Sequence, residues 1–138
     1  RQNLAMTGSV SQMGEVQPVG GLNEKIEGFF DVCAARGLTG SEGVIIPAIN
    51  RRHLMLKKEV VNAISEKQFS IYLVKTVDEA VSLLTGLDAG ECDSAGLYPQ
   101  DSINGRVEET LLRFAMDLQE FEKGEEKKEE EDNEKRIL

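Results

Sequence analysis

The chain has 138 residues, of which 40% are hydrophobic and 30% charged, and its formal net charge is -9. This length permits one domain with a modest core and some additional segments. The acidic balance argues against nucleic acid as a partner, because phosphate binding requires clustered Lys and Arg. The sequence contains neither an apolar run of the roughly 20 residues that span a bilayer nor a charged-then-apolar leader. We therefore expect a cytoplasmic protein with no membrane partner, and a chain that begins with Arg1 is expected to be part of a longer one.

The first third of the sequence predicts a hairpin followed by a helix. Residues 4–10 form a strand-like run, residues 11–15 are polar and typical of a turn, and residues 16–19 can return as the partner strand. Apolar side chains then recur at helical spacing over residues 22–36, and Gly37 ends the pattern.

The middle of the sequence alternates short strands with helices. Residues 43–47 are apolar and predict a buried strand, residues 60–64 predict a short helix, and residues 69–75 alternate as a second strand does. Residues 76–79 have the spacing of a capping box and open a helix that ends at Gly86. This order predicts a domain of the α/β class that ends at Gly86.

The C-terminal third predicts a linker, an amphipathic helix and a charged tail. Glycine, proline and polar residues fill the linker at 87–102, and the helix at 103–121 carries one apolar stripe that requires a partner surface. The stripe consists of Ile103, Val107, Leu111, Phe114, Leu118 and Phe121. Glu and Lys dominate residues 122–138, which predicts a disordered tail or, alternatively, a frayed charged helix.

Three segments of the first 86 residues carry a specific resemblance to a known family. They read LAMTGSV from Leu4, GEVQPVGGLNEKI from Gly14 and GVIIP from Gly43. In order and spacing they resemble the proteolytic domain of Lon-family ATP-dependent Ser/Lys proteases. Residues 1–86 are similar to the C-terminal half of that domain, and Tyr98 with the helix that follows resembles the extension of a bacterial Lon-like branch. The resemblance implies that Lys25 is the lysine of the catalytic dyad and that Thr7 supports it.

The chemistry of such a dyad sets requirements for Lys25. A lysine accepts a proton from a serine only when its pKa falls well below about 10.4, and a helix N-terminus contributes less than one unit of that change. Burial supplies the larger part. Because Leu22 and Phe29 lie at i-3 and i+4, we expect Lys25 to be at least half buried, with its amine near Thr7. The alternative is an ordinary surface cation in a helix.

The nucleophilic serine of the dyad is expected to lie outside this chain. In the family it precedes the lysine by some forty residues, whereas only 24 residues precede Lys25 here. Ser9 and Ser11 fall in the hairpin, where no glycine nest or helix N-terminus follows them to form an oxyanion hole. His53 stands among cations and is interpreted as a surface residue. The isolated chain is therefore expected to be inactive.

The resemblance implies an ATP-dependent serine endopeptidase that degrades unfolded or regulatory proteins and assembles as a homo-oligomer, a hexamer in the family. We expect no cofactor or metal in this chain, because a phosphate-binding loop motif and metal-ligand spacing are lacking. ATP is expected to bind to the AAA+ module of the parent protein. The alternative function is that of a non-catalytic assembly module. In either case, more apolar surface is expected to be exposed than in a complete domain.

Overall fold

The computed structural model describes residues 1–136, including the side chains of residues 1–123. Two compact units make up the chain, Arg1–Ala89 and Gly90–Leu138. The first unit extends three residues past the expected boundary at Gly86.

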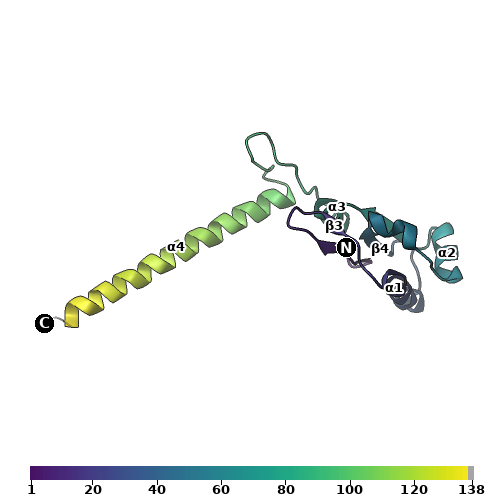
Figure 1. Cartoon of the computed structure of the whole chain (residues 1–138), viewed down its shortest axis with the longest axis horizontal. Coiled ribbons are helices and arrows are strands. Elements are labelled where there is room, and N and C mark those ends of the chain that lie inside the picture. Colours follow the sequence, from purple (N-terminus) through teal and green to yellow (C-terminus); the bar gives the residue numbers. More distant parts are fainter. Residues whose placement is uncertain (137–138) are drawn as a thin grey trace. The chain divides into compact units, whose positions relative to one another are not determined.

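A small parallel sheet forms the centre of the first unit (Figure 1). Its strands lie in the order β1-β4-β5, so β4 is the middle strand. Helices and a 3-10 helix connect the strands, as in other α/β domains. The elements of this sheet and its connections are β1 (Leu4–Met6), α1 (Leu22–Arg36), β4 (Gly43–Pro47), η1 (Ala48–His53), α2 (Lys58–Ser65), β5 (Ser70–Val74) and α3 (Val77–Thr85).

Side chains from β4 divide the core into two parts. Val44 and Ile46 pack with buried residues of α1 and α2, and Ile45 packs with Ala80 of α3. The alternation of side chains along a strand therefore places α1 and α2 on one face of the sheet and α3 on the other. Every residue of β4 is buried, which explains why its sequence is continuously apolar. The predicted α/β class is confirmed.

The hairpin is shorter than the sequence predicted. Residues 4–10 do not form one strand, because β1 ends at Met6 and pairs in parallel with β4. Only β2 (Ser9–Val10) pairs with β3 (Val16–Gln17), in an antiparallel arrangement. The chain changes direction around Gly8, where an added Cβ would lie 3.2 Å from Val16 Cγ1 and 3.5 Å from Pro47 Cγ. Glycine permits this close approach and separates the two strands.

The capping box at the start of α3 is present, but the glutamate bonds to the residue before the N-cap instead of to the N-cap itself. Thr76 Oγ1 accepts a hydrogen bond from the Glu79 N–H at 3.3 Å, as predicted. Glu79 Oε2 accepts from the N–H of Lys75 at 2.6 Å, one residue before the cap. The helix ends at Gly86, which has a φ of 79° and suits the left-handed conformation there.

The second unit consists of a loop and one long helix, α4 (Ile103–Arg136). Ser102 begins the helix: its buried hydroxyl accepts from the Gly105 N–H at 3.1 Å and donates to the Pro99 carbonyl at 2.6 Å. Asn104 Nδ2 donates to the carbonyl of Gly90 at 3.1 Å. These bonds tie both ends of the predicted linker to the first turn of α4.

Helix α4 continues through most of the segment for which a disordered tail was expected. The backbone is helical to Arg136, which corresponds to the alternative of a charged helix. Glu and Lys have high helix propensity, and this explains how a helix persists without apolar residues. Residues 137 and 138 of the predicted tail lie outside the described part of the chain. Among the described residues, no helix combines the length and apolar character that a bilayer crossing requires.

Candidate functional site

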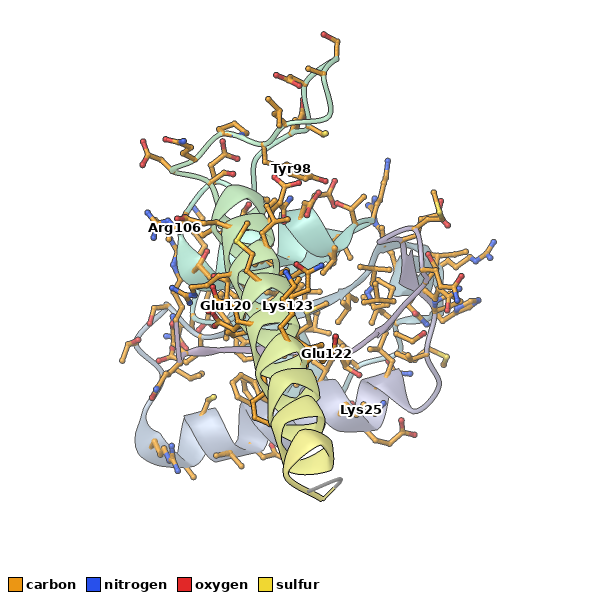
Figure 2. All side chains as sticks on the ribbon, turned by 90° about the vertical axis from the view of Figure 1, so that its left-hand side faces the viewer. Lys25, Tyr98, Arg106, Glu120, Glu122 and Lys123 are labelled. Atoms are coloured by element: carbon orange, nitrogen blue, oxygen red, sulfur yellow. The ribbon has the colours of Figure 1, made fainter. Side chains whose placement is uncertain are left out.

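Lys25 and Thr7 lie together at one edge of the sheet. Thr7 directly follows β1, and its N–H donates to the carbonyl of Ile45 on β4 at 3.1 Å. Lys25 belongs to the first turn of α1, the violet helix in Figure 2. Its Nζ donates to Thr7 Oγ1 at 3.3 Å. The predicted contact between the amine and the Thr7 hydroxyl is therefore present.

The predicted burial of Lys25 is wrong for this chain, because the residue is exposed. The side chains of Leu22 and Ile26 on the same helix are buried in the core, and Phe29 packs against that core. These apolar residues point towards the sheet and α2, so they do not enclose the stem of Lys25. The amine is anchored on one side by Thr7 and is open to solvent on another.

Helix α1 begins without a side-chain cap. Gly21 is the N-cap residue and has a φ of 63°, and its lack of a side chain leaves the helix without a side-chain cap. The N–H of Lys25 donates to the Gly21 carbonyl at 3.3 Å, which closes the first turn. The start of α1 is held by the burial of Leu22 in the core and by hydrogen bonds from other segments.

Asn50 of η1 supplies two such hydrogen bonds. Its Oδ1 accepts from the Val19 N–H at 3.1 Å, and its Nδ2 donates to the Val19 carbonyl at 3.0 Å. Asn50 is only 5% exposed. Asn50 was not predicted from the sequence, although a polar residue three positions after the buried strand β4 is a signal that the sequence contains.

A second asparagine ties α1 to the segment that follows η1. Asn23 Oδ1 accepts from the Met55 N–H at 2.9 Å, and its Nδ2 donates to the His53 carbonyl at 3.4 Å. Glu27, one turn further along, accepts from the Lys57 N–H at 2.7 Å. The first two turns of α1 are thus bonded to residues 53–57.

The two hairpin serines are engaged in bonds of the hairpin itself. Ser9 Oγ donates to Gln17 Oε1 at 3.3 Å, and Ser11 Oγ accepts from the Glu15 N–H at 3.2 Å. The side chain of His53 is exposed, as expected for a surface residue. These contacts give the serines a role in the turn and leave Thr7 as the hydroxyl bonded to Lys25.

Three titratable groups of the same unit have displaced pKa values. A hydrogen bond to Asp31 raises the pKa of Lys57, and hydrogen bonds from Thr39 lower the pKa of Glu42. Desolvation raises the pKa of the Cys33 thiol. None of these groups bonds to Lys25 or Thr7, so each belongs to the local structure of its own segment.

The geometry has a defined chemical capacity. A neutral lysine amine that donates one hydrogen to a fixed hydroxyl keeps its lone pair available for a proton. Because the amine is also open to solvent, a nucleophile carried by a neighbouring segment can approach it. In the described part of the chain, no group of three or more His, Cys, Asp or Glu residues is placed to hold a metal.

Comparison with known proteins relates the unit that carries this site to one family. A family model described as the Lon protease C-terminal proteolytic domain matches residues 1–86. A putative Lon protease homolog of Escherichia coli is 57% identical over 86 residues, which cover 62% of this chain and 15% of that protein. A putative Lon protease homolog of Haemophilus influenzae is 48% identical over 87 residues, or 63% of this chain and 14% of the relative.

More distant relatives carry the same family name. A Lon protease of Trichlorobacter lovleyi is 39% identical over 83 residues, 60% of this chain and 9% of that protein. The chain thus spans no more than about one seventh of the length of these relatives. Since the family model covers more than half of the chain, the chain belongs to the Lon protease family, with residues 1–86 in its C-terminal proteolytic domain.

Proposed function

We propose that this chain supplies the general base of a Ser/Lys peptidase site, with Lys25 as the base and Thr7 as its support. The hydrogen bond between Lys25 Nζ and Thr7 Oγ1 carries this proposal, because it fixes the amine beside the sheet edge with one side open. The match to the Lon proteolytic domain supports a peptidase as the parent protein. The nucleophilic serine belongs to the segment of the parent protein that precedes Arg1.

The proposed reaction follows the course of covalent serine catalysis. Lys25 takes the proton of the serine hydroxyl as its oxygen attacks the peptide carbonyl carbon and forms a tetrahedral adduct. The protonated amine then gives this proton to the leaving amine, the C–N bond breaks, and an acyl-enzyme remains. Water attacks the acyl-enzyme with Lys25 again as base, and the serine and the acid product are released.

An exposed amine is a poor base at neutral pH, since water stabilises an ammonium ion. We propose that the preceding segment of the parent covers the open side of Lys25 and removes this water. Residues 1–138 alone lack both the serine and the cover, so the isolated chain is inactive.

The wider activity is proposed from the family. The parent is an ATP-dependent endopeptidase whose AAA+ module unfolds proteins and delivers them to the site. Its substrates are unfolded or regulatory proteins, its location is the cytoplasm, and it is a homo-oligomer, a hexamer as the family implies. ATP binds to the AAA+ module, and this chain itself holds no cofactor.

A peptidase assay on the full-length protein tests the proposal. Lys25→Ala is expected to lower the rate of casein cleavage by about 100-fold or more, the usual contribution of a general base. Lys58→Ala is the matched control, because Lys58 is also an exposed lysine in the first turn of a helix. Cleavage at the wild-type rate by Lys25→Ala would contradict the proposal.

A non-catalytic assembly role remains the second candidate, and the apolar stripe of α4 favours it. Its side chains from Val107 to Phe121 are 50–62% exposed, as a surface that contacts another protein would be in a single chain. In this case the full-length protein cleaves no substrate with or without Lys25, and deletion of residues 103–138 changes its oligomeric mass. Cleavage that depends on Lys25 would decide for the peptidase.

A further inference from the structure

The strongest unassigned feature of the first unit is a polar clamp around the start of α1. It consists of Asn50, Asn23 and the backbone groups to which they bond. Asn50 is the one buried polar side chain of residues 1–89, all of which the structure describes. A buried amide has to satisfy both its donor and its acceptor, and here it does so on a single residue, Val19.

The hydrogen bonds of the clamp hold the chain on both sides of Gly20-Gly21. Asn50 bonds to Val19 immediately before the two glycines, and Asn23, two residues after Gly21, bonds to residues 53 and 55. An added Cβ at Gly20 would meet no atom within 4 Å, so no side chain packs against Gly20 itself. The hydrogen bonds of the clamp, together with the burial of Leu22 in the core, hold the first turn of α1, which carries Lys25.

Thr7, which accepts the hydrogen bond from Lys25, lies at the same edge of the sheet as Asn50. Thr7 follows β1, Asn50 lies in the 3-10 helix that follows β4, and these two strands pair in parallel. The carboxyl ends of parallel strands meet at one edge, so a single rigid element sets the positions of Thr7 and Asn50. Asn50 therefore links the sheet edge that carries Thr7 to Val19, which precedes the helix that carries Lys25.

We propose that Asn50 is a positioning residue of the peptidase site, which holds Lys25 in its reactive position through the backbone of Val19. This inference rests on the proposed function of Lys25 and adds a residue that touches neither the substrate nor the reacting atoms. An amide suits the task because it offers a donor and an acceptor side by side. An aspartate at this position still accepts from the Val19 N–H. Its second carboxylate oxygen faces the Val19 carbonyl oxygen, and two acceptors repel each other.

The test measures kcat and KM for a fluorogenic peptide with the full-length protein and its variants. Asn50→Asp is expected to lower kcat by about 10- to 100-fold, since a shift of about 1 Å in a catalytic group has an effect of this size. KM is expected to change by less than about 3-fold, because the interaction is used in the transition state rather than in substrate binding. The pH at which kcat/KM reaches half its maximum is also expected to move, because the surroundings of the base change.

Two further variants separate positioning from simple loss of the fold. Asn23→Ala removes the partly exposed side of the clamp and leaves the core intact, and it is expected to lower kcat in the same direction at an unchanged melting temperature. Asn62→Ala makes the same chemical change on an exposed position of α2 and is expected to leave kcat unchanged.

The outcomes distinguish this inference from the function on which it rests. Wild-type cleavage by Lys25→Ala overturns both. Loss of cleavage in Lys25→Ala, together with an unchanged kcat and pH profile in Asn50→Asp and Asn23→Ala, overturns the positioning role alone. If Asn50→Asp does not fold, an unchanged kcat in Asn23→Ala overturns it.

Discussion

At the level of single residues, the amine of Lys25 donates a hydrogen bond to the hydroxyl of Thr7. The backbone N–H of Thr7 donates to the carbonyl of Ile45 on the central strand, so the Thr7 hydroxyl is an anchored acceptor for the long side chain of Lys25. A long side chain loses conformational entropy when it is held in one geometry. A hydrogen-bond partner that already holds the side chain in place reduces the entropy that is lost during the reaction. In the proposed reaction Thr7 orients Lys25 and is not itself consumed.

Replacement of Thr7 by valine tests this role. Thr7→Val keeps the shape of the side chain and removes its oxygen, so kcat of the full-length protein is expected to fall about 3- to 10-fold, the worth of one hydrogen bond. Thr7→Ser retains the hydroxyl and is expected to stay within about 2-fold of the wild type. Equal rates for Thr7→Val and wild type would remove Thr7 from the site.

The lowered pKa of Glu42 predicts a pH dependence of stability. Glu42 accepts hydrogen bonds from the N–H and the hydroxyl of Thr39 at 2.9 and 2.7 Å. Because its pKa in the folded state lies below the unfolded value of about 4.3, the stabilisation is present above that pH and is lost as the pH falls through the folded pKa. Denaturant unfolding should show wild type more stable than Glu42→Gln at pH 7, with a difference that shrinks under acid conditions. A difference that is independent of pH would contradict this assignment.

At the level of secondary-structure elements, periodicity predicted most of the first unit correctly. The apolar residues of α1 recur at helical spacing and β4 is continuously apolar, so both patterns follow from the burial of these elements. Periodicity could not predict that residues 4–10 form two strands, which belong to two different sheets. Whether a strand pairs with its neighbour in sequence or with β4 depends on long-range contacts, here the close approach of Gly8 to Val16 and Pro47.

The candidate site shows the same division between local and long-range information. The Lys25 and Thr7 positions follow from motifs, and their contact is present. The burial of Lys25 was predicted from its helical neighbours Leu22 and Phe29, but these side chains pack into the core and do not cover the lysine beside them. Asn50 was missed because its bonds join residues 31 positions apart in the sequence.

The apolar stripe of α4 leads to a prediction at the scale of this element. Val107, Leu111, Phe114, Leu118 and Phe121 repeat at intervals of four and three, and we expect another protein surface to cover them. Leu111→Asp introduces a charge that is costly to bury, so it is expected to lower the oligomeric mass or the melting temperature of the full-length protein. Met116→Asp makes a comparable change on the opposite face of the helix and is expected to have little effect. An unchanged mass and melting temperature for Leu111→Asp would show that the stripe remains uncovered.

At the scale of the whole molecule, this chain spans a small share of the length of its relatives. Its matched residues cover 15% of the Escherichia coli relative, and its exposed side chains include apolar residues in both units, among them Met13, Met55, Phe114 and Phe121. Surface of this kind is usually covered in the complete protein or its assembly. We therefore propose that this chain contributes a base and its supports, and that the rest of the parent protein contributes the serine, the cover and the delivery of substrates.

The central claim is that an amine at position 25 is the base of the peptidase site, and chemical rescue tests it most directly. Lys25→Cys in the full-length protein is expected to lower casein cleavage by about 100-fold or more, since the side chain then has no amine. Treatment with 2-bromoethylamine converts that cysteine into a lysine analogue with an amine at nearly the same position. Treated wild type controls for alkylation of Cys33 and Cys92, and iodoacetamide controls for a modified thiol without an amine. We expect that only 2-bromoethylamine restores cleavage in Lys25→Cys, and either full activity before treatment or no recovery after complete modification would contradict the role of Lys25 as the base.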